Sequence, residues 1–274
     1  MGHSISAAAR RDIRGLGATH IAARANRGEG ANRPLEEGAG GPAAPDVPLS
    51  FGRWAWEWAK SFLIAIAFFL VIRTFLVEAY RIPTSSMENT LLAGDFLLVD
   101  KAAFGSFVPF TRVRVPAYDR PARGDVIVFT PPHDPRRSYV KRLIAVPHDT
   151  VEMRDKRVRV NGAPLDEPYV HTTDPLDSNS PHMVWQCAYH ARTAAGPCRP
   201  MRDNWGPLVV PARQYLVLGD NRDNSEDSRY WGFVGRDDIR GRPLFIYYSF
   251  DPFSRRPLPW LTHIRWGRIG EAVH

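Results

Sequence analysis

The longest apolar stretch of the chain lies between residues 51 and 80, FGRWAWEWAKSFLIAIAFFLVIRTFLVEAY. No polar side chain interrupts it from Phe62 to Ile72. Residues 58–77 make 20 positions, which as a helix measure about 30 Å, the thickness of a bilayer core. A helix that is apolar on every face for three turns is unusual inside a soluble protein. The pattern predicts one transmembrane helix over residues 54–77.

The flanks of this helix favour an anchor whose N-terminus is cytoplasmic. Trp54, Trp56 and Trp58 are typical of an aromatic belt at a membrane interface, and eight Arg or Lys precede the apolar run. A cleavable signal peptide is the alternative, because residues 77–79 (VEA) resemble a small-x-small cleavage site. The hydrophilic lead is, however, far longer than an ordinary n-region. Residues 1–53, rich in Ala, Gly, Arg and Pro, are predicted to form a disordered cytoplasmic tail.

After residue 78 the pattern changes to short runs of β-branched and aromatic residues, separated by turns rich in Pro, Gly and Asp. No ten-residue helical periodicity occurs there, so we expect a mostly β fold of packed antiparallel sheets over residues 78–274. Residues 164–212 have a weak strand signal and are expected to form an insertion or a smaller lobe. The predicted strands are 96–99, 125–129, 140–146, 158–160, 214–218 and 244–248.

Composition narrows the classes of function. The net charge is +7, but the basic residues are scattered and no aromatic-interleaved basic stretch occurs, so we expect no nucleic-acid partner. Cys187 and Cys198 lie eleven positions apart, which fits neither a CxxC redox motif nor a zinc site. In an exported domain they can form a disulfide; two free thiols are the alternative.

Three segments carry groups capable of chemistry. The first, 83–91 (PTSSMENTL), has a hydroxyl cluster of the kind usual in turns. The second, 138–142 (SYVKR), places a Lys inside an apolar strand, where Lys is usually a solvated edge residue. The third, 219–232 (GDNRDNSEDSRYWG), is dense in polar groups and suggests a solvated loop or a calcium loop, although its carboxylates do not follow the EF-hand pattern. None of the three identifies a function alone.

Taken together, these segments resemble the active-site boxes of the type I signal (leader) peptidases, which are Ser-Lys proteases. The resemblance runs from about Phe62 to Gly270 and includes RGDVIVF (123–129), YVKR (139–142), GDNRDNSEDSRYWGFV (219–234) and IRW (264–266). It implies a membrane-bound serine endopeptidase that removes signal peptides from exported preproteins. Cleavage would follow small residues in an Ala-x-Ala-like sequence and proceed through an acyl-enzyme.

The resemblance also implies a cellular location and partners. The protein would be a single-pass protein of the inner (cell) membrane, with a catalytic domain that is periplasmic or extracellular. Its partners would be signal peptides and the lipid bilayer. We expect a monomer that needs neither a cofactor nor a metal.

Carried over residue by residue, the resemblance assigns roles. Ser86 is the nucleophile, Lys141 is the general base, and Ser225 hydrogen-bonds the lysine and orients it. The Thr84 hydroxyl joins the Ser86 N–H in an oxyanion hole. Two further sets are implied: a supporting ion pair of Asp227 with Arg229, and shallow substrate pockets lined by Ile82, Pro83, Met87, Leu91, Tyr139 and Val140.

One position departs from the family pattern. Asn89 stands where the family usually has a Pro that stiffens the turn beside the nucleophile. Asn tolerates turn geometry well. We therefore expect activity to be retained with some loosening of the turn.

The assigned chemistry is physically consistent. A serine hydroxyl is a poor nucleophile until a neighbouring base removes its proton. An unperturbed Lys has a pKa of about 10.4, so only roughly one in 2,500 is neutral at pH 7. Burial against Tyr139 and Met87 would lower the pKa of Lys141. The chain has 32 Arg and only four Lys, and an Arg at position 141 could not lose its proton in this way.

Three other functions compete with this one. A Ser-His-Asp hydrolase is the second enzyme hypothesis, since nine His are present and His133 adjoins Asp134, but no G-x-S-x-G elbow surrounds a serine. A related Ser-Lys protease that processes a dedicated partner or itself remains open. So does a catalytically inactive, membrane-tethered binding protein, although the intact Ser86, Lys141 and Ser225 argue against it.

Overall fold

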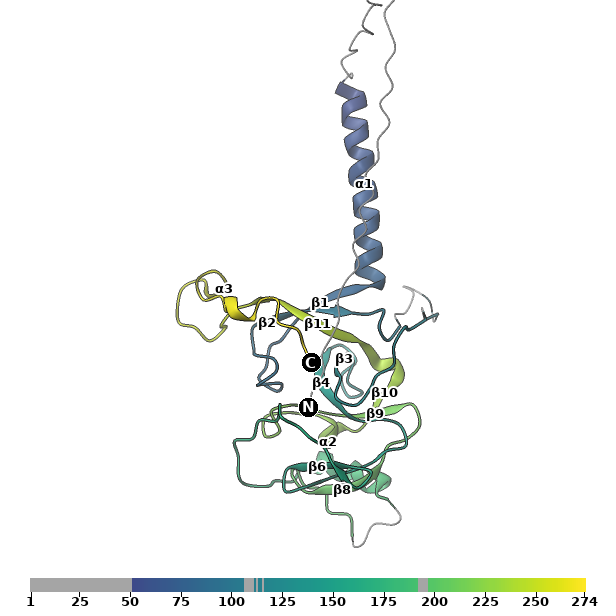
Figure 1. The fold of residues 1–274 in the computed structure, drawn as a ribbon, viewed down its shortest axis with the longest axis vertical. Helices are drawn as coiled ribbons and strands as arrows, with labels where there is room; N and C mark the ends of the chain where they lie inside the picture. Colours follow the sequence, from purple (N-terminus) through teal and green to yellow (C-terminus); the bar gives the residue numbers. More distant parts are fainter. Residues whose placement is uncertain (1–50, 106–110, 112, 115, 192–196) are drawn as a thin grey trace, which may run out of the picture. The chain divides into compact units, whose positions relative to one another are not determined.

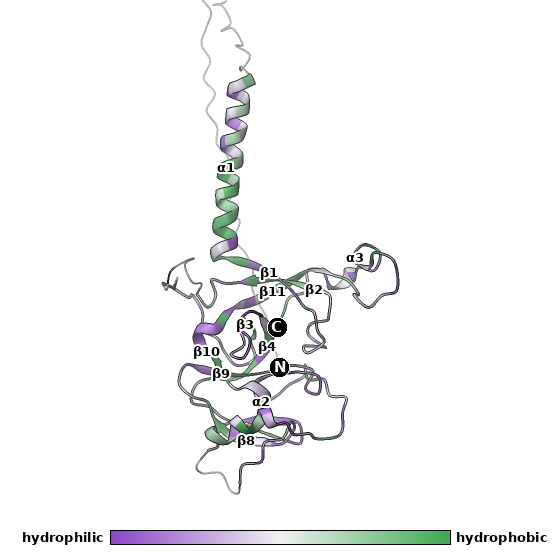
Figure 2. Ribbon diagram, turned by 180° about the vertical axis from the view of Figure 1, so that it is seen from behind, coloured by the Kyte–Doolittle hydropathy of each residue, from purple (hydrophilic) through white to green (hydrophobic). Residues whose placement is uncertain are grey.

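A computed structural model describes residues 51–274, except 106–110, 112, 115 and 192–196 (Figure 1). Of the predicted cytoplasmic tail, residues 1–50 lie outside the described part, and residues 51–53 belong to the first helix. This helix, α1 (Phe51–Phe75), has 25 residues, buries none of its side chains, and is long and apolar enough to cross a membrane. Figure 2 shows that its more hydrophobic half is the one that leads into the β domain.

The helix lies slightly earlier in the chain than the predicted span of residues 54–77. Its last turn closes with the hydrogen bond from Leu76 N–H to the Ile72 carbonyl, 2.8 Å long. From Val77 onward the chain is a strand, and Val77 pairs with Asp100. Apolar character continues across this boundary, so hydrophobicity alone does not show where the helix ends.

Seven antiparallel strands form the main sheet, in the order β1-β2-β11-β3-β4-β9-β10. The expected fold class, mostly β with antiparallel sheets after one apolar helix, is confirmed, and every predicted strand overlaps an observed one, although 244–248 covers less than half of β11. The strands are β1 (Val77–Arg81), β2 (Asp95–Asp100), β3 (Val126–Phe129), β4 (Tyr139–Ala145), β9 (Gln214–Leu218), β10 (Val234–Gly235) and β11 (Ile239–Ser249).

A smaller antiparallel sheet has the strand order β7-β6-β5-β8. Residues 164–212, the expected smaller lobe, contribute β8 and the 3-10 helix η1, whereas β5 and β6 come from earlier in the chain. Cys187 and Cys198 form a disulfide, which decides between the two alternatives left by the sequence. The bounds are β5 (Thr150–Arg154), β6 (Arg157–Val160), β7 (Ala163–Pro164), β8 (Trp205–Val209) and η1 (Pro181–Tyr189).

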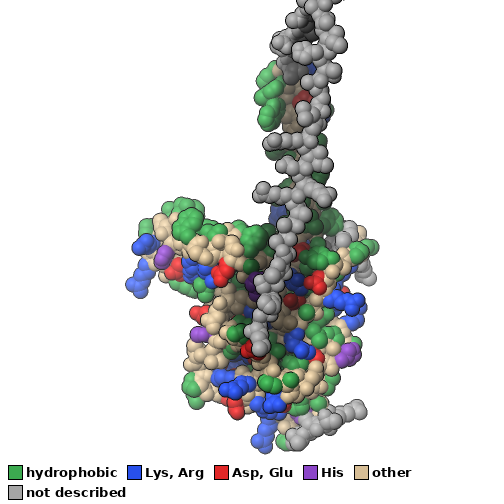
Figure 3. Space-filling view, in the orientation of Figure 1, with side chains coloured by type: hydrophobic (Ala, Val, Ile, Leu, Met, Phe, Trp, Pro, Cys, Tyr) green, Lys and Arg blue, Asp and Glu red, His purple; other side chains and the backbone are tan. Residues whose placement is uncertain are grey.

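Four short helical segments complete the described elements. They are α2 (Ser228–Trp231), η2 (Arg236–Asp238), α3 (Pro259–Thr262) and η3 (Trp266–Arg268). Figure 3 shows apolar side chains gathered over α3, where Trp260 and Leu261 are exposed, while positive and negative side chains are interspersed over the β domain.

Strand β3 is buried on both faces. Val126 and Val128 pack into one apolar cluster with Leu97 and Ile246, whereas residues 127 and 129 pack into another on the opposite side. An uninterrupted apolar run is the pattern expected of a strand covered on both sides. Its neighbour β4 is buried from its third residue onward, so the side chains that β4 carries are fixed by the core.

Candidate active site

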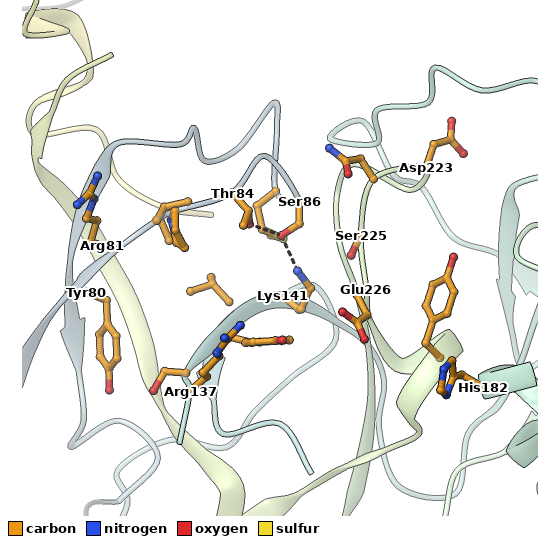
Figure 4. Close-up of a pocket in the computed structure, with 18 of the residues that line it drawn as sticks. Tyr80, Arg81, Thr84, Ser86, Arg137, Lys141, His182, Asp223, Ser225 and Glu226 are labelled. Atoms are coloured by element: carbon orange, nitrogen blue, oxygen red, sulfur yellow. Dashed lines mark hydrogen bonds between the residues drawn. The ribbon is translucent and has the colours of Figure 1, made fainter. Parts of the chain in front are cut away.

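Ser86 and Lys141 meet in the folded chain although 55 positions separate them. Ser86 lies in the turns between β1 and β2, and Lys141 lies in β4. The Lys141 Nζ atom is 2.5 Å from the Ser86 Oγ atom, within hydrogen-bonding distance (Figure 4). Lys141 is only 4% exposed, and its Nζ lies 5.8 Å from the centre of the Tyr139 ring. The structure therefore holds an amine and a hydroxyl together with little water around the amine.

Burial controls the charge of Lys141. Loss of hydration is the main cause that lowers the pKa of Lys141 from 10.5 to about 8. The negative charge of Asp227 raises this pKa, and the positive charge of Arg229 lowers it; Glu226 raises it by a smaller amount. With a pKa of about 8, roughly one Lys141 in ten is uncharged at pH 7 and able to accept a proton.

The backbone around Ser86 is fixed by the polar loop that follows β9. The Asn221 N–H donates to the Ser86 carbonyl over 3.2 Å. A Cβ atom added to Gly219 would lie 2.5 Å from the same carbonyl oxygen and would also collide with the Ser225 side chain. Only glycine permits so close an approach of the two segments. The loop thus sets the position of the Ser86 backbone directly.

Thr84 also contacts Ser86. The Thr84 Oγ1 and Ser86 Oγ atoms are 3.4 Å apart, a long hydrogen bond. Within the described part of the chain, the Ser86 N–H takes no part in the backbone hydrogen bonds of the surrounding turns. A hydroxyl and an N–H are therefore available beside the Ser86 oxygen.

Ser225 lines the same pocket as Lys141, but the expected hydrogen bond between Ser225 and Lys141 is not formed. The Ser225 hydroxyl is buried, lies close to the Asp227 carboxylate, and forms no hydrogen bond with the Lys141 Nζ atom. Lys141 instead donates to Ser86. The orienting role of Ser225 remains a prediction.

Asp227 and Arg229 form the expected ion pair. Their side chains are fully buried, with 2.8 Å between the Arg229 Nε and Asp227 Oδ1 atoms. Asp227 also accepts the Gly219 N–H over 3.0 Å. The pair therefore braces the loop that holds Ser86, and both of its charges influence the pKa of Lys141.

A pocket of about 830 Å³ surrounds the Ser86–Lys141 contact. Five of the six residues predicted to bind substrate line it: Ile82, Pro83, Met87, Tyr139 and Val140. Leu91 does not line it. Its N–H donates to the Met87 carbonyl over 2.7 Å, which turns the fully buried Leu91 side chain into the core against Leu97. Leu91 supports Met87 from behind and is not part of the pocket wall.

One buried ion pair at the site was not predicted. Arg142 donates twice to Asp220, over 2.9 and 2.7 Å, and both side chains are almost completely buried. Thr90 Oγ1 also bonds to Asp220, at 2.5 Å, and the Tyr169 ring stacks over the guanidinium. The pair ties β4, the loop after β9 and the turn of Ser86 together. An Arg in the buried part of a strand was the available signal, since such a charge requires a carboxylate partner.

The aspartates of the dense polar run 219–232 form ion pairs, some with residues outside the run. Asp220 pairs with Arg142, Asp227 pairs with Arg229, and the Asp223 carboxylate lies 2.5 Å from Lys156. Among the described residues, no three His, Cys, Asp or Glu side chains come together as a possible metal site. The carboxylates of this loop are therefore used for structure, which disfavours the calcium-loop alternative.

Comparison with known proteins identifies the family. The family model described as signal peptidase, peptidase S26, matches residues 55–248. The chain is 40% identical over 223 residues to signal peptidase I of Pseudomonas aeruginosa, with 76% of this chain and 78% of the relative covered. It is 36% identical over 230 residues to signal peptidase I of Pseudomonas fluorescens, with 78% of each covered. The chain belongs to the signal peptidase family, peptidase S26.

Members of this family are serine peptidases, and the chain is accordingly a hydrolase. Among solved structures, a signal peptidase I from Enterococcus faecalis is 31% identical, with a TM-score of 0.32 and with 45% of this chain and 97% of that chain covered. The family match includes Ser86, Lys141 and the loop residues described above. The expected membership is thus confirmed.

The departure from the family pattern at Asn89 has a structural counterpart. Asn89 has a φ of +84°, in the left-handed region. The ring of proline fixes φ near about −65°, so proline cannot adopt this backbone. Asn adopts left-handed conformations more readily than most residues. In this chain the turn beside Ser86 is therefore built for Asn rather than for the usual Pro.

We predict that Asn89→Pro, which restores the family residue, will impair this protein. Forcing φ to change should cost about 1–3 kcal/mol and displace Ser86, lowering kcat/KM for preprotein cleavage at least tenfold. Asn89→Gly, which keeps positive φ accessible, should remain within threefold of wild type. Steady-state cleavage and the thermal unfolding midpoint test this. An Asn89→Pro protein that is both more stable and more active would refute it.

Proposed function

We propose that this protein removes signal peptides from exported preproteins, with Ser86 as nucleophile and neutral Lys141 as general base. The observation that carries the proposal is the 2.5 Å contact between the Lys141 Nζ and Ser86 Oγ atoms, with Lys141 buried. Membership of the signal peptidase family supports the substrate class.

The reaction proceeds in two halves. Lys141 Nζ takes the Ser86 proton as Oγ attacks the scissile carbonyl carbon, and the resulting ammonium returns that proton to the leaving amine. This forms an acyl-enzyme and releases the mature protein. In the second half, Lys141 takes a proton from water, the hydroxide oxygen attacks the ester carbon, and Ser86 regains its proton as the signal peptide leaves.

The residues around the pair have supporting roles in this mechanism. The Ser86 N–H and the Thr84 hydroxyl stabilise the oxyanion, a role in which each donor typically contributes about 3 kcal/mol. Ser225 orients the amine when Lys141 releases its contact with Ser86. Asp227 and Arg229 keep the loop behind Ser225 in place.

The substrate binds as an extended strand beside the end of β1. The pocket wall there consists of Ile82, Pro83 and Met87 on one side and Tyr139 and Val140 on the other. An extended peptide sends alternate side chains into the wall, so shallow apolar depressions select small residues at two alternate positions. This fits cleavage after an Ala-x-Ala-like sequence.

Helix α1 anchors the protein in the inner (cell) membrane as a single span. The N-terminus is cytoplasmic, the catalytic domain is periplasmic or extracellular, and the protein acts as a monomer. The Cys187–Cys198 disulfide supports an oxidising compartment for the domain. Ser86 follows Val77 by nine residues, which span at most about 30 Å even when extended. The nucleophile thus stays near the bilayer that holds the substrate.

We predict that Ser86→Ala, Lys141→Ala and Lys141→Arg each reduce preprotein cleavage by the purified full chain in detergent at least about a thousandfold. The arginine variant keeps the charge but cannot become neutral. Ser85→Ala is the matched control, because the Ser85 hydroxyl accepts from Asn224 Nδ2 over 2.8 Å and no hydrogen bond joins it to Lys141. The control should stay within threefold of wild type.

Two results would rule out this mechanism. Equal cleavage by wild type and the Ser86 and Lys141 variants would show that another group attacks the peptide. Absence of cleavage by the folded wild-type protein would instead favour the inactive binding protein or the protease with a dedicated partner.

We also predict that kcat/KM rises with pH with a midpoint near 8 and levels off above it. The base works only when neutral, so activity is lost as pH falls through the Lys141 pKa of about 8. Glu226→Gln removes a negative charge that raises this pKa, so its midpoint should move to lower pH. A substrate without titratable groups near the cleavage site isolates the effect. A profile that is flat between pH 6 and 9 would contradict the assignment.

A further inference from the structure

A second pocket, of about 240 Å³, is lined by five cationic side chains and one carboxylate. It lies between the first residues of β1, the start of β11 and the segment that precedes β4. The carboxylate is that of Glu78, and the cations are Lys101, Arg114, Arg136, Arg137 and Arg240. We refer to it as the basic pocket.

The basic pocket adjoins the end of α1. Glu78 is the second residue of β1, and Lys101 directly follows β2. The Lys101 N–H donates to the carbonyl of Leu76, one residue beyond the helix, over 2.8 Å. If α1 spans the bilayer as proposed, this pocket therefore lies where the chain leaves the membrane.

The basic pocket also adjoins the catalytic pocket. Tyr80, Arg137 and Ser138 line both of them. Burial, followed by the negative charge of Glu78, raises the pKa of Tyr80 to about 12. A neutral tyrosine thus forms part of the wall between the two pockets, and a ligand in one can influence the other.

Among the described residues, the positive charges of the basic pocket outnumber the nearby carboxylates. Asp134 is shared by Arg136 and Arg137, at 3.9 and 3.2 Å. Glu78 lies 3.4 Å from Lys101. In the part of the chain that the structure describes, Arg240 forms no ion pair and donates only to the neutral Thr130 hydroxyl, at 2.9 Å.

Arg114 lies close to other cations. It pairs with Asp237 at 3.3 Å, and Asp237 also pairs with Arg213. The pKa of Arg114 is lowered mainly by burial and also by the positive charges of Arg236 and Arg240. Cations that repel one another in a partly buried site are stabilised by a bound anion.

We propose that the basic pocket binds the phosphate of an anionic phospholipid headgroup at the bilayer surface. Guanidinium groups match the geometry of phosphate oxygens and bind them with two parallel hydrogen bonds. The membrane supplies phosphate groups at high local concentration beside the end of α1. Free phosphate has the same chemistry, so the source must be separated by experiment. The inference rests on the proposed membrane anchoring.

A bound headgroup would hold the β domain against the bilayer. Because the two pockets share a wall, the catalytic pocket would then lie close to the surface from which a membrane-bound substrate emerges. The lipid is thus a positioning ligand, and it takes no part in the bond that is cleaved.

The experiment titrates the full-length protein in uncharged detergent, on a Ser86→Ala background, with short-chain phosphatidylglycerol, short-chain phosphatidylcholine or inorganic phosphate. Binding is followed by calorimetry. We expect saturable binding of phosphatidylglycerol, at least tenfold tighter than binding of the other two. Arg136→Gln with Arg240→Gln should weaken it at least tenfold. The control, Arg157→Gln with Arg199→Gln, makes the same charge change at exposed positions outside the pocket and should stay within twofold.

Several outcomes would overturn the proposal. Equal weakening by the control pair would mean that diffuse charge attracts the lipid. Equal affinity for inorganic phosphate would make free phosphate the ligand. Because this binding is measured without cleavage, its failure is distinct from failure of the proposed function, which the wild-type cleavage assay tests separately.

Discussion

The burial of one amine beside one hydroxyl is the constraint on which this structure depends. Lys141 is the first buried residue of β4, and within the described part of the chain its amine hydrogen-bonds with Ser86 alone. Removing water from an ammonium is unfavourable, and the protein accepts that cost because the amine must be neutral to take a proton. The two-sided burial of β3 and β4 supplies the dry surroundings. The sheet therefore does more than carry the site: it sets the chemical state of the base.

Buried ion pairs position the hydroxyl. Arg142 with Asp220 joins β4 to the loop after β9, and Asp227 with Arg229 braces that same loop; each pair lies out of contact with water. Such pairs add little net stability, since desolvation offsets much of their attraction, but losing one partner leaves a buried charge that the fold tolerates poorly. The effect of these two ion pairs is to fix the position of the backbone. They hold the backbone at Gly219 against the Ser86 carbonyl, where no side chain would fit.

Much of this arrangement could be predicted from the sequence, and the remainder has physical reasons. Buried strands such as 126–129 are recognisable because an apolar run persists on both faces. Strands β5 (TVEMR) and β8 (WGPLV) were missed, since charges, glycine and proline interrupt their pattern. The family motifs located Ser86 and Lys141. They did not reveal that Asp220 pairs with Arg142 across 78 positions, because a linear pattern does not show which charges meet.

The most direct test of the central claim is the pKa of the Lys141 amine itself. The chain contains only four lysines, so selective ¹⁵N labelling of lysine side chains gives few signals, and the signal absent from Lys141→Arg belongs to Lys141. A pH titration of that signal in the full-length protein should give a pKa of about 8. A value at 10.5, where an exposed lysine titrates, would mean that the amine remains charged at neutral pH and that the mechanism is wrong.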